Sequence, residues 1–206
     1  RVIDLTRVRE LRRVERYRHH IAIGAGVTLQ DAFAALVQDR PQLQPFADRF
    51  AGMPVRNAGT LGGNVANGSP IGDSMPLLIA LGASVVLMQD ANGRIAHREI
   101  MLEDLYTGYR SNVMTPIEVL AWIKVPLPST APAIAAVAPL NQSDSAACAT
   151  GCMMRVYKVS KRFEDDISAI CLALEITVEN GIVRRASIGV GGVAATPVRA
   201  RKTEAI

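Results

Sequence analysis

Residues 56–73 read RNAGTLGGNVANGSPIGD, and the rest of the sequence is best understood outward from this stretch. Its five glycines allow the backbone to adopt positive φ angles and to approach a ligand without interference from a Cβ atom. Successive backbone N–H groups in such a stretch can form a concave anion site for a pyrophosphate. Short side chains that can bind sugar hydroxyl groups accompany the glycines: Thr60, Asn64, Asn67 and Ser69. The stretch predicts a ligand-binding loop, with an irregular surface loop as the alternative.

Two common phosphate-binding loops do not match this stretch. A Walker loop requires a Lys and then a Ser or Thr directly after its last glycine, and that pair does not follow here. The Rossmann fingerprint requires G-x-G-x-x-G between a strand and a helix, and the glycine spacing here is different. The residues of the stretch alone therefore leave both interpretations open.

The flanking sequence predicts a mixed α+β domain with antiparallel strands. Thr28 is placed to cap a helix over residues 28–37, because its hydroxyl can accept a first-turn N–H and Asp31 favours the positive end of the helix. Turn signals at residues 90–93 and 180–181 separate apolar strands. Further elements are expected as follows: strands over 1–5, 21–26, 83–88, 118–125, 169–179 and 182–190, and helices before Gly52 and over 74–82.

Composition argues against several classes of function. Hydrophobic residues make up 49% of the 206 residues and charged residues 20%, which is typical of a folded domain. Aromatic residues reach only 4%, which argues against a base-stacking RNA surface. Much of the net charge of +4 comes from arginines over residues 7–18, but Glu10 and Glu15 lie among them and weaken attraction to phosphate. We therefore expect a solvated segment and no nucleic-acid partner.

Cellular location and metal binding are constrained by the apolar runs and the cysteines. No run of about 18 apolar residues exists to span a membrane, and no signal peptide is recognisable. Three cysteines, an odd number, indicate a reducing compartment, so we expect a cytoplasmic protein. Cys148 and Cys152 are four residues apart and Cys171 stands alone, whereas zinc or iron–sulfur sites need three or four ligands at closer spacing. We expect free thiols and no metal site.

Several short motifs occur in a fixed order along the chain. They are Gly62-Gly63-Asn64 running into Ser69-Pro70-Ile71-Gly72-Asp73, then Gly108-Tyr109-Arg110, PIEVL over 116–120, YKVSKRFEDDIS over 157–168 and GGVAATP over 191–197. In this order they resemble the FAD-binding domain of molybdenum hydroxylases, the family of xanthine dehydrogenases, aldehyde oxidases and carbon monoxide dehydrogenase flavoproteins. Within that family, the pattern over 160–168 is most similar to the small subunit of bacterial xanthine dehydrogenases.

The resemblance implies roles for individual residues. Phe50 matches an aromatic residue near the adenine, with a position in the core as the alternative. Lys158 matches a lysine near the flavin ring and is the expected catalytic residue, because a cation there can stabilise negative charge on the reduced flavin; an exposed lysine is the alternative. The other cofactor-binding positions implied are Thr60, Gly62, Gly63 and Asn64 at the phosphates and ribityl chain, Asn67 and Asp73 at hydroxyl groups, and Leu120 beside the isoalloxazine.

Two further interpretations remain open at this stage. Asp73 can cap the helix that follows it, with or without a role in cofactor binding. Four charged residues match a loop near the flavin or form a solvated surface turn: Lys161, Arg162, Asp165 and Asp166.

The parent protein implied by the resemblance is an oxidoreductase. It hydroxylates a purine at a molybdenum centre on another subunit, passes electrons through iron–sulfur clusters to FAD, and reduces NAD by hydride transfer. The resemblance therefore implies FAD as cofactor, NAD as acceptor, and iron–sulfur domains and a molybdopterin-binding large subunit as partners. The alternatives are the flavoprotein of a carbon monoxide dehydrogenase-like or other molybdenum hydroxylase, and a lobe without cofactor.

The resemblance also implies a domain organisation. The expected fold is a two-lobed FAD-binding domain of the vanillyl-alcohol-oxidase/PCMH type, followed by an antiparallel-sheet lobe. The expected parts are an N-terminal lobe over 1–54, a second lobe over 55–128, an Ala-rich linker over 129–152 and the start of a C-terminal lobe over 153–206. The family's first Gly-rich FAD segment and its iron–sulfur domains lie upstream of the position matched by Arg1, so we expect a truncated chain that carries part of the site.

Overall fold

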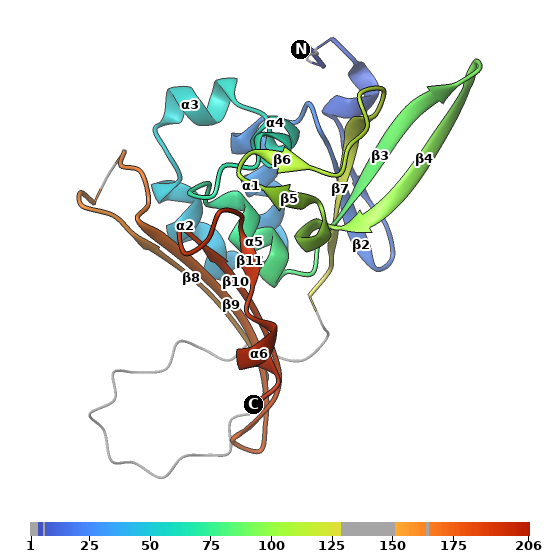
Figure 1. The fold of residues 1–206 in the computed structure, drawn as a ribbon. Helices are drawn as coiled ribbons and strands as arrows, with labels where there is room; N and C mark the ends of the chain where they lie inside the picture. The colour runs from blue at the N-terminus through green and yellow to red at the C-terminus, as the bar shows by residue number, and fades with distance from the viewer. Residues whose placement is uncertain (1–3, 6, 129–150, 164) are drawn as a thin grey trace.

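The computed structural model describes residues 4–5, 7–128, 151–163 and 165–206 (Figure 1). Two sequence predictions fall largely outside this range. Of the strand expected over residues 1–5, only residues 4 and 5 are described, and they are not in a strand. Of the linker expected over 129–152, only Gly151 and Cys152 are described, and they begin a strand.

A five-stranded antiparallel sheet forms one outer layer of the described part of the molecule. Its strands lie in the order β1-β2-β7-β3-β4, and their bounds are β1 Val14–Arg16, β2 His20–Gly24, β3 Ser84–Ala91, β4 Arg94–Met101 and β7 Val119–Pro126. The central strand β7 places Ile123 opposite Ile23 on β2 and opposite Val85 on β3. All three side chains are fully buried, so one face of this sheet supplies part of the core.

A second sheet of four strands lies across the molecule from the first (Figure 1). Its order is β11-β10-β9-β8, with bounds β8 Gly151–Val159, β9 Ile170–Glu179, β10 Ile182–Gly191 and β11 Val198–Arg199. The predicted β9–β10 hairpin is confirmed. Asn180 and Gly181 at its turn both have positive φ, 54° and 74°, as a two-residue turn of this hand requires.

Several short helices, among them α1, α4 and α5, lie between the two sheets (Figure 1). The bounds of the helices are η1 Arg9–Arg12, α1 Leu29–Asp39, η2 Pro41–Leu43, α2 Gln44–Arg49, α3 Met53–Ala58, α4 Leu61–Asn67, α5 Ser74–Ala80, η3 Leu102–Asp104 and α6 Arg201–Glu204. Helix α4 contacts β2 and β7 of the first sheet, and α5 contacts β9 and β10 of the second. The mixed helix and antiparallel sheet class predicted from the sequence is confirmed.

The start of α1 confirms the predicted cap. Thr28 accepts a hydrogen bond from the Asp31 backbone N–H at 3.1 Å, and the helix buries Leu29, Phe33 and Leu36 at helical spacing. The cap satisfies one of the N–H groups that a helix leaves without an internal partner. This helix could be predicted from the local sequence because the capping residue and the apolar spacing both indicate it.

The structure corrects the prediction of a loop over residues 56–73, because most of these residues are helical. Helix α3 occupies residues 53–58 and α4 occupies residues 61–67. Thr60 caps α4, while Leu61 and Val65, four residues apart, are fully buried. Burial of that apolar edge, together with the cap, outweighs the low helix propensity of two glycines.

The third sheet is a small two-stranded hairpin beside α4. Strands β5 (Tyr106–Gly108) and β6 (Ser111–Asn112) form a separate two-stranded sheet next to this helix (Figure 1).

Candidate functional site

One side of α4 carries predicted cofactor residues at helical spacing. Four of them follow the i, i+3, i+4, i+7 pattern and form what we call the polar face of α4: Thr60, Gly63, Asn64 and Asn67. Residues with this spacing share one side of a helix, whereas Leu61 and Val65 on the opposite side are buried in the core. Two of the four, Gly63 and Asn67, are exposed, so the polar face is open to a ligand.

The first-turn N–H groups of α4 are occupied by the protein itself. Leu61 donates to Val27 O at 3.0 Å and Gly62 donates to Ala25 O at 3.2 Å. Gly63 donates to the Thr60 hydroxyl at 3.1 Å. The Asn64 N–H donates to Thr60 O at 3.0 Å. These four N–H groups are therefore engaged within the protein, and pyrophosphate binding by this stretch stays a prediction.

Gly62 serves packing and does not belong to the polar face. A Cβ atom on Gly62 would lie 2.3 Å from the Ala25 Cβ atom and 2.5 Å from its Cα atom. No side chain fits at that separation, so the glycine is what allows α4 to approach the end of β2. Gly62 therefore has a packing role, and the cofactor role implied for it stays a prediction.

The start of α5 is held against the polar face of α4. The Ser74 hydroxyl donates to Asn64 Oδ1, and Ser74 is fully buried. This contact fixes the orientation of the Asn64 amide and brings the residues around 73 beside α4. Ser74 directly follows the Ser-Pro-x-x-Asp motif, yet its hydroxyl has a role that the motif does not indicate.

The clearest electrostatic feature is an ion pair between Asp73 and Lys158. The Lys158 Nζ atom lies 2.8 Å from Asp73 Oδ2, and the two side chains are only 5% and 6% exposed. The partners are 85 residues apart in sequence, with Asp73 preceding α5 and Lys158 on β8. The structure therefore joins the expected catalytic lysine to an expected cofactor residue, and Lys158 is not an exposed surface lysine.

One carboxylate oxygen of Asp73 remains unsatisfied. Asp73 Oδ1 is buried and accepts no hydrogen bond from any residue that the structure describes. Asp73 occupies the N-cap position of α5, but its side chain makes no capping hydrogen bond, so the capping interpretation is wrong. A buried carboxylate oxygen without a donor is energetically costly, which suits a site that a hydroxyl-bearing ligand completes.

Cys171 completes the buried surroundings of Asp73. Its thiol donates to Asp73 O at 3.8 Å, and Cys171 lies opposite Lys158 in the β8–β9 register. Burial raises the pKa of the Cys171 thiol above its usual value, and the nearby Asp73 carboxylate raises it further. The thiol therefore stays neutral and acts as a small packing group.

Two predicted cofactor residues lie in the hydrophobic core. The Phe50 ring packs against Phe33 and Phe46, with centroids 4.6 Å and 5.9 Å away, and Phe50 is 6% exposed. The core interpretation of Phe50 accounts for this position, because adenine stacking needs an accessible ring face. Leu120 pairs with Leu87 on the adjacent strand and is equally buried. Neither side chain belongs to the polar face of α4.

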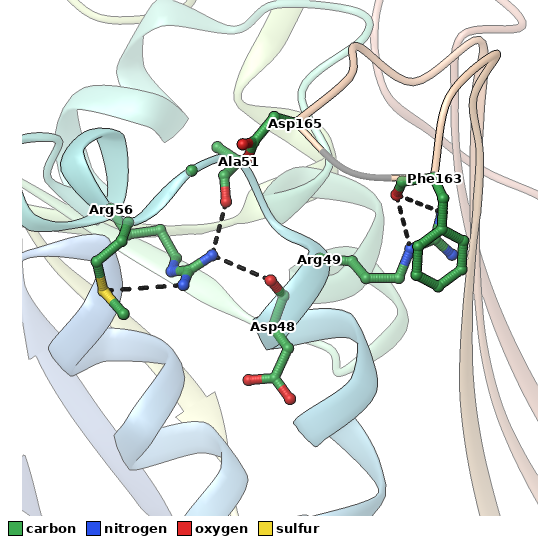
Figure 2. Close-up of a pocket in the computed structure, with 8 residues that line it drawn as sticks. Asp48, Arg49, Ala51, Arg56, Phe163 and Asp165 are labelled. Carbon is green, nitrogen blue, oxygen red and sulfur yellow. Dashed lines mark hydrogen bonds between the residues drawn. The ribbon is translucent and has the colours of Figure 1, made fainter.

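The described residues of the charged loop over 160–168 make hydrogen bonds with one another and with α2. Asp166 accepts from the Arg162 backbone N–H at 2.8 Å, and hydrogen bonds to that carboxylate lower its pKa. Arg49 of α2 lies over the Phe163 ring at 4.2 Å and donates to Phe163 O (Figure 2). The exposed Arg162 side chain fits the solvated-turn interpretation, whereas the Arg49–Phe163 contact had no signal in the sequence.

A pocket of about 280 Å³ lies between this loop and the α2–α3 connection (Figure 2). Arg56 forms its inner wall, and the guanidinium donates to Ala51 O at 2.6 Å and to Gln30 Oε1 at 2.9 Å. Asp165 reaches the mouth beside Gly52. The Arg56 guanidinium is therefore engaged by the protein itself and does not offer its donors to a ligand in this pocket.

Two residues outside every predicted motif hold the far end of α4. The Tyr106 hydroxyl donates to Val65 O at 2.9 Å, and Asn112 Nδ2 donates to Ala66 O at 3.4 Å. Both come from the β5–β6 hairpin. No sequence signal marked them, because the contacts join segments more than 40 residues apart.

Neither metal ligands nor membrane spans stand out in the described ranges. No helix among these residues is long and apolar enough to cross a membrane. Likewise, the described residues include no group of three or more His, Cys, Asp or Glu side chains that could hold a metal ion. Cys152 and Cys171 are free thiols, and Cys148 lies outside the described residues.

Comparison with known protein families covers both sheets. Residues 1–128 match the family described as the FAD binding domain in molybdopterin dehydrogenase. Residues 155–206 match the family described as the CO dehydrogenase flavoprotein C-terminal domain. The polar face of α4 and Asp73 fall in the first match, and Lys158 falls in the second.

Individual relatives agree with these families. Xanthine dehydrogenase of Drosophila subobscura is 32% identical over 98% of this chain, which corresponds to 15% of that protein. Nicotinate hydroxylase of Emericella nidulans is 33% identical over 75% of this chain and 10% of its own length. Among solved structures, CO dehydrogenase from Oligotropha carboxidovorans superposes with a TM-score of 0.77 at 26% identity, covering 96% of this chain and 61% of that chain.

The chain thus spans a small part of its curated relatives and about three fifths of the matched CO dehydrogenase chain. The relatives are oxidoreductases of one family, and the similarity extends through both sheets. The family match covers more than half of the chain. This chain belongs to the FAD-binding domains of the xanthine dehydrogenase-like molybdenum hydroxylases.

Proposed function

We propose that this chain binds FAD along the polar face of α4 and at Asp73, and that it transfers electrons within a larger molybdenum hydroxylase. The observation that carries the proposal is the buried Asp73 Oδ1 atom, which has no hydrogen-bond donor among the described residues. The next residue, Ser74, contacts Asn64 on the polar face of α4. FAD presents ribityl and ribose hydroxyl groups, so a hydroxyl donor can satisfy this oxygen.

The residues present fit the sugar part of FAD better than its pyrophosphate. Asn67 is exposed, and the Asn64 amide is oriented by Ser74, so both can hydrogen-bond to hydroxyl groups. Gly63 leaves the middle of the polar face without a side chain. The occupied first-turn N–H groups supply no donors for the phosphates. We propose that donors for the pyrophosphate come from elsewhere in the parent protein.

Lys158 is proposed to act chiefly by holding Asp73. Its ammonium group compensates the buried carboxylate at 2.8 Å and fixes the position of that side chain. The resulting pair is close to neutral, so the charge that Lys158 can offer to a reduced flavin is smaller than an isolated lysine would provide. FAD, when bound, supplies the redox chemistry, and the residues here bind and orient it.

The activity of the whole parent protein is part of the proposal. Xanthine dehydrogenase relatives suggest a purine-oxidising enzyme with NAD as acceptor, iron–sulfur domains and a molybdopterin-binding large subunit as partners, and a cytoplasmic location. The domain boundaries predicted from the sequence, the two-lobed PCMH-type description and the similarity to bacterial small subunits are retained as predictions. The similarity to CO dehydrogenase supports the flavoprotein of such an enzyme as the second candidate.

FAD binding to the parent protein, which would carry the rest of the site, tests the proposal. We expect FAD to remain bound after gel filtration with quenched flavin fluorescence. Asn67→Ala should weaken binding about fivefold, which corresponds to one hydrogen bond of about 1 kcal/mol. Asn57→Ala is the matched control, because Asn57 is an exposed asparagine on the neighbouring helix α3. Failure of the parent protein to retain FAD, or equal affinities of the two variants, would contradict the proposed site.

A further inference from the structure

The C-terminal end of α4 is held by a hairpin that belongs to none of the cofactor motifs. Tyr106 on β5 and Asn112 on β6 donate hydrogen bonds to the carbonyl groups of Val65 and Ala66 in the last turn of α4. Figure 1 shows this hairpin beside the helix. A backbone hydrogen bond closes the base of the hairpin, because Val113 N donates to Leu105 O at 3.0 Å.

A seven-residue helix with two internal glycines needs such external support. Helices shorter than about 12 residues are marginal in water, and the last four carbonyl groups of any helix lack partners within it. In α4, Gly68 N–H and the Tyr106 hydroxyl both donate to Val65 O, at 3.1 Å and 2.9 Å. The position of the last turn therefore depends on Tyr106 as well as on the helix itself.

The Tyr106 ring also packs on the turn that ends α4. Gly68 is buried with a left-handed φ of 58°, and a Cβ atom at Gly68 would lie 2.9 Å from Tyr106 Cε1. This close approach is possible because residue 68 is a glycine. The Tyr106 hydroxyl and ring thus hold both the last turn of α4 and the residue after it.

The hydroxyl of Tyr106 keeps its proton over the whole physiological range. Burial of the side chain raises the pKa of Tyr106 well above its usual value. The hydroxyl therefore remains a hydrogen-bond donor to Val65 O, and the contact does not switch with pH.

We infer that Tyr106 is a positioning residue for FAD, which rests on the proposed function of the polar face of α4. Asn67 is the last residue of α4, and Asp73 lies six residues further along the same chain segment. Tyr106 contacts the backbone on both sides of Asn67, at Val65 before it and at Gly68 directly after it, without joining the polar face itself. By fixing that backbone, Tyr106 sets the spacing between Asn67 and Asp73 that the sugar hydroxyl groups of FAD would meet.

Tyr106→Phe tests this inference with the ring preserved and the hydroxyl removed. The dissociation constant for FAD, measured by flavin fluorescence quenching well below the unfolding temperature, should rise about fivefold because one hydrogen bond to the site backbone is lost. Tyr17→Phe is the control, since Tyr17 donates to Glu15 Oε2 on β1, at the edge of the five-stranded sheet. Its FAD affinity should equal that of the unmodified parent protein.

A purely structural role for Tyr106 gives a different result. In that case Tyr106→Phe lowers the unfolding temperature but leaves the FAD dissociation constant unchanged under conditions where the protein is folded, and this outcome overturns the inference. Gly68→Ala is the second variant, expected to weaken FAD binding more than tenfold because the added Cβ displaces the Tyr106 ring and strains a left-handed residue.

The two proposals fail in distinguishable ways. If the unmodified parent protein does not bind FAD, the proposed function is wrong. If the parent protein binds FAD and Asn67→Ala weakens binding while Tyr106→Phe does not, the polar face of α4 is correctly assigned and the positioning role of Tyr106 is wrong.

Discussion

Two ion pairs of the same chemistry occupy opposite environments in this molecule. Asp73 and Lys158 are 2.8 Å apart and almost fully buried between α5 and β8. Glu99 and Lys124 are 2.5 Å apart on the five-stranded sheet, with side chains 43% and 32% exposed. Water screens the second pair and leaves the first with its full desolvation cost. Burial, and not the distance between the charges, therefore decides how strongly the fold depends on each pair.

The largest expected effect comes from breaking the buried pair. Lys158→Met leaves the Asp73 carboxylate buried without a counter-charge and should lower the free energy of unfolding by about 3–5 kcal/mol. Lys124→Met, the matched change at the exposed pair, should cost less than about 1 kcal/mol. Urea unfolding followed by circular dichroism measures both. Similar losses for the two variants would show that the Asp73–Lys158 pair is open to solvent.

Substitutions at two adjacent glycines compare a buried position, Gly62, with an exposed one, Gly63. Gly62→Ala forces a Cβ atom to within 2.3 Å of the Ala25 Cβ atom and should lower the unfolding free energy by about 1–3 kcal/mol. Gly63→Ala meets only the Thr60 hydroxyl on the exposed side, and the gain in helix propensity offsets part of that contact. We expect its unfolding free energy to change by less than about 1 kcal/mol. Equal losses would refute the packing role of Gly62.

A third comparison concerns the pH dependence of stability at Glu118, whose partner Arg98 is partly exposed. Arg98 donates to both Glu118 carboxylate oxygens, at 2.6 Å and 2.9 Å, and this contact lowers the pKa of Glu118 from 4.5 to about 2. A carboxylate with a lowered folded-state pKa stabilises the fold above its unfolded pKa and loses that stabilisation as pH falls. The unfolding free energy should therefore decrease from about pH 4.5 to about pH 2.

Glu118→Gln isolates this contribution. The variant should be less stable at neutral pH, and its stability should depend less on pH over the same range. Acid titrations of the two proteins, followed by intrinsic Trp122 fluorescence, measure the difference. Identical pH profiles would show that the Arg98–Glu118 contact does not lower the pKa of Glu118 in solution.

Structural features that depend on neighbouring residues could be predicted from the sequence. Thr28 caps α1 because the hydroxyl and its acceptor geometry lie within four residues, and Asn180-Gly181 turns the chain because both residues tolerate positive φ. The polar face of α4 was also identifiable, since its residues belong to one continuous motif. Phe50 could not be assigned in the same way, because an aromatic side chain suits both a core and a ligand site.

The sequence by itself determined the mixed helix and antiparallel sheet class, the family of FAD-binding domains, and the residues that gather on α4. Only the tertiary structure decided that the Gly-rich stretch is helical, that Asp73 pairs with Lys158, and that Tyr106 holds the end of α4. The physical reason is distance along the chain. Helix caps and turns are set by neighbouring residues, whereas burial of a short helix and compensation of a buried charge depend on partners that folding brings together.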